Sequence, residues 1–122
     1  MKTQRIYKKG APQGAPFLKI MIADSFLLRL RGLMGRRRMP EKTGLLLTPC
    51  DSVHMCFMRF SIDVVYLNKE FTILKIVKSL KPWTGLSMCR GAWAALELNA
   101  GEAERFGWVV GGKLVLETGD QI

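Results

Sequence analysis

Short apolar runs separated by turn residues are the feature that most restricts the fold of this chain. Each run is too short for a typical helix and is bounded by turn-forming or charged residues, which is typical of β-strands. Runs of this kind predict strands at Phe17 to Ala23, Leu45 to Thr48, Val53 to Met58, Ile62 to Leu67, Phe71 to Val77, Ala92 to Leu98 and Lys113 to Glu117. The pattern therefore predicts a predominantly β domain.

Two other segments have the pattern of short helices. Asp24 is a suitable cap for a helix whose apolar residues share one face: Phe26, Leu27, Leu30, Leu33 and Met34. In the second segment, Asn99 is the expected helix cap, Glu102 follows it three residues later, and Gly107 ends the pattern. A small sheet of about six strands usually curls or closes. We therefore expect an α+β fold that is predominantly β, a small barrel-like antiparallel sheet with one or two short helices.

The positive charge of the chain is concentrated near its amino terminus. Of the 19 Lys and Arg residues, eleven fall within residues 1–42, whereas residues 43–122 are neutral overall. Residues 1–16 combine this charge with Gly and Pro and are interpreted as a basic flexible arm and linker, followed by one globular domain at residues 17–122. Such a basic segment indicates either a solvated terminus or a surface for phosphate backbones or other anionic partners.

Several classes of protein are not indicated by the sequence. There is no run of about 18 apolar residues that would span a membrane, and residues 1–14 do not resemble a secretory signal, so a cytoplasmic location is expected. The three cysteines lack CxxC spacing, which favours reduced thiols over a disulfide framework. Motifs of nucleotide-binding proteins, serine hydrolases and metalloproteases are missing. We therefore expect no cofactor, and a binding or accessory role is favoured over catalysis.

A group of polar and aromatic residues predicts a possible binding pocket for a small ligand or a protein partner. Asp63 lies within an apolar strand, where a buried carboxylate must be paired with a group such as Arg31, Arg59 or His54. The alternative is that Asp63 lies at the floor of a ligand pocket. Trp83 follows Pro82, so its indole is held on a stiff loop, where it stacks on a ligand or covers the open end of the barrel. The candidate ligand-binding residues are His54, Met58, Asp63 and Trp83.

One alternative function is nucleic-acid binding through the basic amino-terminal region. Its candidate residues are Arg29, Arg31, Arg36, Arg37 and Arg38. Basic side chains of this kind bind phosphates, but base stacking also needs exposed aromatic residues, and Tyr7 is the only clear candidate nearby.

A second alternative is a small enzyme or metal site around His54. If Val53 to Met58 is a strand, His54, Cys56 and Met58 share one face and offer ligands suited to Cu(I). Cys50, Met88 and Cys89 are further candidate ligands for such a site. His54 and Cys56 also resemble a base and a nucleophile, but positions i and i+2 of a strand lie roughly 6–7 Å apart, too far for a direct hydrogen bond. Ordinary core packing is the preferred interpretation, and no metal is expected.

Several segments together resemble the family known as domain of unknown function 192. They are Arg31 to Arg36, Gly44 to Leu47, His54 to Met58, Ile62 to Leu67, Lys81 to Trp83, Leu96 to Leu98, Ala100-Gly101 and Gly107 to Leu114. The resemblance implies a small, predominantly β domain with no established reaction. It also implies that some relatives are exported with a leader. Residues 1–14 do not resemble such a leader, which fits the cytoplasmic location expected here. The chain departs from the family pattern at Cys56, where a bulky residue is expected.

Overall fold

The structure, a computed structural model, describes residues 2–12, 14–25, 33, 36 and 38–118. Within these residues the strands are β1 (Lys2–Lys8), β2 (Leu18–Ala23), β3 (Thr43–Leu47), β4 (Ser52–His54), β5 (Ile62–Leu67), β6 (Ile73–Leu80), β7 (Leu86–Met88), β8 (Ala94–Asn99) and β9 (Leu114–Thr118), and the helix is α2 (Glu102–Arg105).

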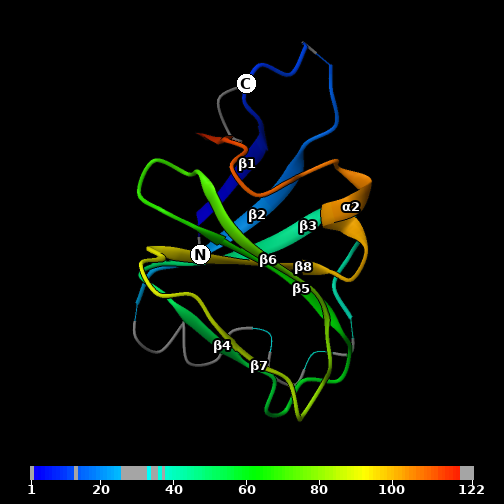
Figure 1. Ribbon diagram of the computed structural model, residues 1–122. Coiled ribbons are helices and arrows are strands. Elements are labelled where there is room, and N and C mark those ends of the chain that lie inside the picture. The colour runs from blue at the N-terminus through cyan, green and yellow to red at the C-terminus, as the bar shows by residue number, and fades with distance from the viewer. Residues whose placement is uncertain (1, 13, 26–32, 34–35, 37, 119–122) are drawn as a thin grey trace.

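Seven of these strands form one curled sheet in the order β6-β5-β8-β3-β2-β1-β9, and β4 and β7 form a separate two-stranded sheet. The two outer strands of the large sheet approach each other at one end. There Thr72 bridges to Lys113, and the N–H of Leu114 donates to the carbonyl oxygen of Phe71 at 3.0 Å. The large sheet is therefore a half-barrel (Figure 1), which confirms the predominantly β, barrel-like fold with a short helix.

One strand pair differs from the expected antiparallel arrangement. Among the strand pairs of the described residues, β2 and β3 alone run parallel, with Ile20 opposite Gly44. Residues 24–42 make the connection, because parallel neighbours need a crossover rather than a tight turn. The helix expected after Asp24 falls in this connection and lies almost entirely outside the described residues. No helix in the described part of the chain has the length and apolar character needed to cross a membrane.

The half-barrel sheet has a hydrophobic core on each face. On one face, strand residues such as Leu96 pack with Ala103 of α2. On the other face, Tyr66 of β5 packs with Val53 of β4 and with Met55, which follows β4. Because successive residues of a strand point to opposite faces, the fully buried strand β5 contributes to both cores. The second core, which we call the lower core, holds the small β4–β7 sheet against the half-barrel.

The amino-terminal segment forms a strand, which the interpretation of residues 1–16 as a flexible arm did not include. Strand β1 pairs with β2 on one side and with β9 on the other. Ile6 is fully buried, and the side chains of Arg5 and Tyr7 both bind the carboxylate of Glu117. The arm interpretation is therefore wrong for Lys2–Lys8, because pairing with the distant strand β9 turns a polar segment into part of the sheet.

Candidate functional site

The small β4–β7 sheet and the two turns beside it carry four large, exposed apolar side chains, which we call the apolar ridge. Phe57 and Trp83 lie in the turns after β4 and before β7, and Leu86 and Met88 lie on β7. Their exposed fractions are 59%, 57%, 73% and 68%. Figure 1 shows the two turns at the lower end of the molecule, far from β1 and β9. Large exposed apolar groups gathered in one place are typical of a binding surface.

Leu86 and Met88 point outward because a polar residue occupies the inward position of β7. Ser87 is buried, and its hydroxyl forms a 2.6 Å hydrogen bond with the hydroxyl of Tyr66 in β5. Since side chains alternate along a strand, a slip by one residue would bury both apolar side chains and expose Ser87. The Ser87–Tyr66 bond therefore helps to fix the register that presents Leu86 and Met88 to solvent.

The two turns of the apolar ridge are joined through the backbone of Met55. Its carbonyl oxygen accepts from the N–H groups of Met58 at 3.1 Å and Trp83 at 2.8 Å, and its own N–H donates to the carbonyl oxygen of Gly85 at 3.0 Å. Gly85 permits this approach, because a Cβ there would lie 2.7 Å from the Cγ of Met55, and also 2.5 Å from the carbonyl oxygen of Lys81. The turns are thus held in place before a partner binds, which reduces the entropy lost on binding.

Phe57 and Trp83 adopt a backbone conformation that rarely suits aromatic residues. Their φ angles are 63° and 67°, in the left-handed region, where a bulky residue costs roughly 1–2 kcal/mol. The two rings meet edge to face, with centroids 5.1 Å apart. A ring pair contributes only about 0.5–1.5 kcal/mol, so it does not offset the whole cost of two such residues. Backbone strain at two exposed aromatic residues indicates a functional requirement rather than a gain in stability.

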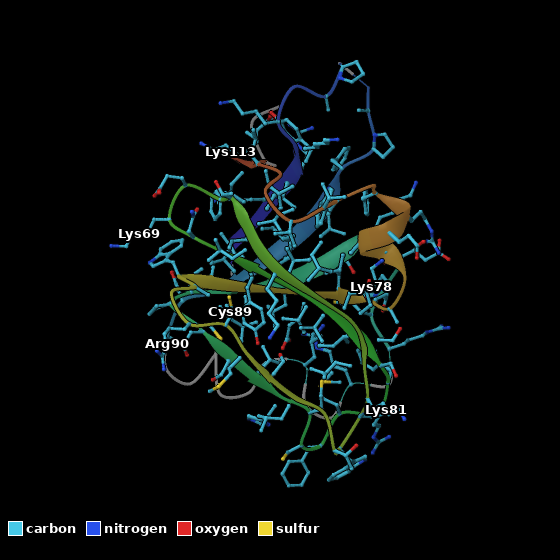
Figure 2. All side chains as sticks on the ribbon, in the orientation of Figure 1. Lys69, Lys78, Lys81, Cys89, Arg90 and Lys113 are labelled. Carbon is cyan, nitrogen blue, oxygen red and sulfur yellow. The ribbon has the colours of Figure 1, made fainter. Side chains whose placement is uncertain are left out.

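Four exposed cations, which we call the basic border, lie next to the apolar ridge in the sequence or contact it: Arg59, Lys75, Lys81 and Arg90. Three of them stand two residues from a ridge residue in the sequence, and the Nζ of Lys75 donates to the carbonyl oxygen of Met88 at 2.9 Å. Figure 2 shows Lys81 and Arg90 toward opposite ends of the small sheet. Within residues 50–61 and 81–91, Asp51 is the only acidic residue. The surroundings of the apolar ridge therefore carry a net positive charge.

The four residues expected to bind a ligand do not share one surface. His54 and Trp83 are exposed, whereas Met58 and Asp63 are buried. Met58 packs in the lower core. Trp83 belongs to the apolar ridge, and His54 lies beside it, directly opposite Leu86 in the β4–β7 pairing. The structure thus brings two of the four residues to the candidate surface and assigns the other two to the interior.

Asp63 is buried and fully hydrogen-bonded, but to backbone groups rather than to the arginines or the histidine considered from the sequence. Its Oδ1 accepts from the N–H of Ser79 at 3.0 Å, and its Oδ2 accepts from the N–H groups of Gly101 at 3.0 Å and Ala103 at 3.2 Å. The last two N–H groups belong to the start of α2, so Asp63 supplies the helix cap that the sequence assigned to Asn99. Its role in the structure is to join β5, β6 and α2.

A second buried carboxylate, Glu97, was not singled out from the sequence. It lies in the central strand β8, between Leu45 of β3 and Val64 of β5, and its Oε1 has no hydrogen-bond partner in the described part of the chain. Burial raises the pKa of Glu97 to about 8. The carboxyl group is therefore largely protonated at neutral pH. A single Glu among the apolar residues of Ala94–Asn99 predicts a side chain that faces solvent. The sequence pattern therefore did not predict the burial of Glu97.

His54, Cys56 and Met58 do not lie on one face of a strand. Strand β4 ends at His54, and Cys56 and Phe57 lie in a turn, so the strand expected over Val53 to Met58 is wrong beyond His54. His54 and Cys56 are exposed, whereas Met58 is buried. Among the described residues, no three His, Cys, Asp or Glu side chains are grouped closely enough to hold a metal ion. The geometry therefore does not support a metal or Cys/His site built on these three residues.

The arginines of the nucleic-acid hypothesis lie largely beyond what the structure describes. Arg36 and Arg38 are exposed, and Arg29, Arg31 and Arg37 fall outside the described residues. Nucleic-acid binding through this region stays a prediction.

Sequence reasoning identified Trp83 but missed the other three residues of the apolar ridge as a binding surface. The only signal for Leu86 and Met88 is the alternation of apolar and polar residues in Leu86-Ser87-Met88. This alternation predicts a strand. Because apolar residues usually face the core, it also predicts that Leu86 and Met88 are buried, whereas the structure buries Ser87 instead.

The fold and the apolar ridge define a class of protein: a small half-barrel β domain with a preformed, exposed apolar surface. Residues 8–116 match the family model DUF192, described as Uncharacterized ACR, and the chain belongs to this family. The resemblance found in the sequence is thereby confirmed.

Two archaeal relatives illustrate the family. The chain is 32% identical over 102 residues to a UPF0127 protein of Pyrococcus furiosus, which covers 80% of this chain and 85% of that protein. It is 36% identical over 70 residues to a UPF0127 protein of Pyrococcus horikoshii, a match that covers 53% of this chain and 58% of that protein.

Two crystal structures share the fold. A protein of unknown function from Novosphingobium aromaticivorans superposes with a TM-score of 0.79 at 18% identity, over 93% of this chain and 83% of that one. A protein of Sinorhizobium meliloti, described as a candidate transcription regulator, gives a TM-score of 0.81 at 24% identity, over 94% of this chain and 92% of that one. At these identities the similarity concerns the fold alone.

Proposed function

We propose that the protein is a binding module and that the apolar ridge is its recognition surface. The observation that carries this proposal is the outward placement of Phe57, Trp83, Leu86 and Met88, all more than half exposed on a folded domain. The residue types also fit, because the centres of binding surfaces are enriched in aromatic residues, Met and Arg. The ridge and its basic border have this composition.

Both the energy and the rigidity of the apolar ridge support recognition. Full burial of one large apolar side chain contributes about 1.5–3 kcal/mol, so four of them offset a large part of the entropy lost when two partners associate. The turns that carry Phe57 and Trp83 are already joined through the backbone of Met55. Little further ordering of the backbone is needed on binding.

Replacing both aromatic residues by Asn separates recognition from stability. Asn tolerates the left-handed backbone of Phe57 and Trp83, so Phe57→Asn with Trp83→Asn should keep the free energy of unfolding within about 1 kcal/mol of the wild type. In gently lysed cells of the native host, the wild type should sediment through a density gradient with larger material. The double variant should sediment as the free chain.

Val109→Asn with Val110→Asn is the matched control for this experiment. These two residues are 60% and 61% exposed and lie in the loop after α2, which Figure 1 shows on the other side of the half-barrel from β4 and β7. The control should sediment like the wild type. A folded Phe57→Asn, Trp83→Asn protein that still sediments like the wild type would show that the ridge is not the recognition surface.

A further inference from the structure

The charge around the apolar ridge specifies the kind of partner, an inference that rests on the function proposed above. The basic border places four cations beside the ridge, against the single carboxylate of Asp51. Elsewhere, Asp63, Glu97 and Glu102 are buried, so the exterior of the protein is more basic than its formal net charge of +9 suggests. Complementary charge therefore favours an anionic partner.

A second copy of this chain does not satisfy that requirement. In a symmetric dimer the same patch is used by both subunits, so each apolar ridge would face the other and each basic border would approach its own copy. Like charges brought together at the edge of an interface oppose association. The occupant of the ridge is therefore a different, negatively charged body.

The position of the apolar ridge suits a soft, deformable partner. The ridge aromatics lie in turns at one end of the molecule (Figure 1). Two pockets among the described residues, of about 440 and 480 Å³, are lined by Phe17 and the amino-terminal loop and include no residue of the apolar ridge. A projecting apolar tip inserts readily into a deformable surface.

The orientation of the side chains favours lipid over single-stranded nucleic acid. Bases stack on the flat faces of aromatic rings, but the rings of Phe57 and Trp83 are inclined at 62° and so do not form a parallel platform. Leu86 and Met88 are the most exposed members of the ridge and have no ring on which a base can stack. Both side chains gain free energy on entering a hydrocarbon environment.

We infer that the partner is the surface of an anionic lipid bilayer. The apolar ridge enters the region between headgroups and acyl chains, where Trp is favoured and where Phe, Leu and Met lose contact with water. The basic border then lies at the level of the lipid phosphates, which attract Lys and Arg. The protein would lie on the membrane without crossing it.

Co-sedimentation with vesicles tests this inference directly. The wild type should bind vesicles of equal parts phosphatidylcholine and phosphatidylglycerol at least about tenfold more tightly than vesicles of phosphatidylcholine alone. Phe57→Asn with Trp83→Asn should lower binding to the mixed vesicles roughly 100-fold, because two large apolar side chains no longer enter the bilayer. Val109→Asn with Val110→Asn should bind like the wild type.

Two further variants separate the electrostatic and apolar contributions. Arg59→Gln with Lys81→Gln should weaken binding to the mixed vesicles and leave binding to phosphatidylcholine vesicles unchanged, since only the former carry a negative surface potential. Trp83→Phe should still sediment with the mixed vesicles. It should lose the blue shift of tryptophan emission that occurs when the wild type binds, because the exposed Trp83 is the tryptophan expected to enter the bilayer. Trp108 is already buried and Trp93 is half-buried.

The possible results distinguish this inference from the proposed function. No binding to the mixed vesicles, or equal binding by the ridge variant and its control, overturns the lipid inference. Binding of a single-stranded oligonucleotide that depends on Phe57 and Trp83, without vesicle binding, also overturns it. In each of these cases the gradient experiment still reports whether the apolar ridge serves some other partner.

Discussion

Replacing Glu97 by Gln should stabilise the protein relative to the wild type, and the difference in unfolding free energy should grow by about 3.5 kcal/mol between pH 5 and pH 8. Burial raises the pKa of Glu97 from 4.5 to about 8. The folded protein therefore holds this proton more tightly than the unfolded chain does. The resulting stabilisation is fully present below pH 4.5 and is lost as the pH rises through about 8. Gln stays neutral and avoids this loss.

Urea unfolding of both proteins at several pH values measures this effect. Glu104→Gln is the matched control, because Glu104 is exposed on α2 and its replacement should leave the pH dependence of the wild type unchanged. If the stability difference between Glu97→Gln and the wild type is the same at pH 5 and pH 8, the carboxyl group is not held protonated by the fold.

Asp63→Ala should lower the free energy of unfolding by about 2–4 kcal/mol, a loss visible as a large drop in Tm. The substitution leaves the N–H groups of Ser79, Gly101 and Ala103 without their acceptor. Asp63→Asn should also be destabilising, because both carboxylate oxygens accept hydrogen bonds and one of them would be replaced by an amide donor.

Thermal or urea unfolding of the two Asp63 variants decides between the structural role and a pocket. Changes within about 0.5 kcal/mol for both variants are what a solvent-open pocket residue would give. That result would contradict the role of Asp63 as the link between β5, β6 and α2.

The strands that could be predicted from the sequence are those with a continuous apolar run. Ile62–Leu67 was expected from its composition and has the same bounds in the structure, because every residue of β5 is buried. Strand β1 was missed because Ile6 is surrounded by polar residues. Its pairing depends on β9, more than 100 residues away in the sequence, and a local pattern carries no information about such a contact.

The apolar ridge could be predicted only in part, for the same reason. Pro82-Trp83 marked a stiff loop with an indole, and Trp83 does lie on the ridge. The exposure of Leu86 and Met88 depends on the bond between Ser87 and Tyr66, a contact between distant strands. Phe57 occupies a left-handed turn position that favours glycine, so its residue type gave no sign of the turn.

Photo-crosslinking from position 86 is the most direct test of the claim that the apolar ridge is the recognition surface. Leu86 is its most exposed residue, and a benzophenone amino acid in its place would react only with molecules in contact with the ridge. In cells of the native host, irradiation should give crosslinked products from position 86 and few from position 110. Adding Phe57→Asn and Trp83→Asn should abolish the products. Equal yields from the two positions, or products that persist in the triple variant, would contradict the account.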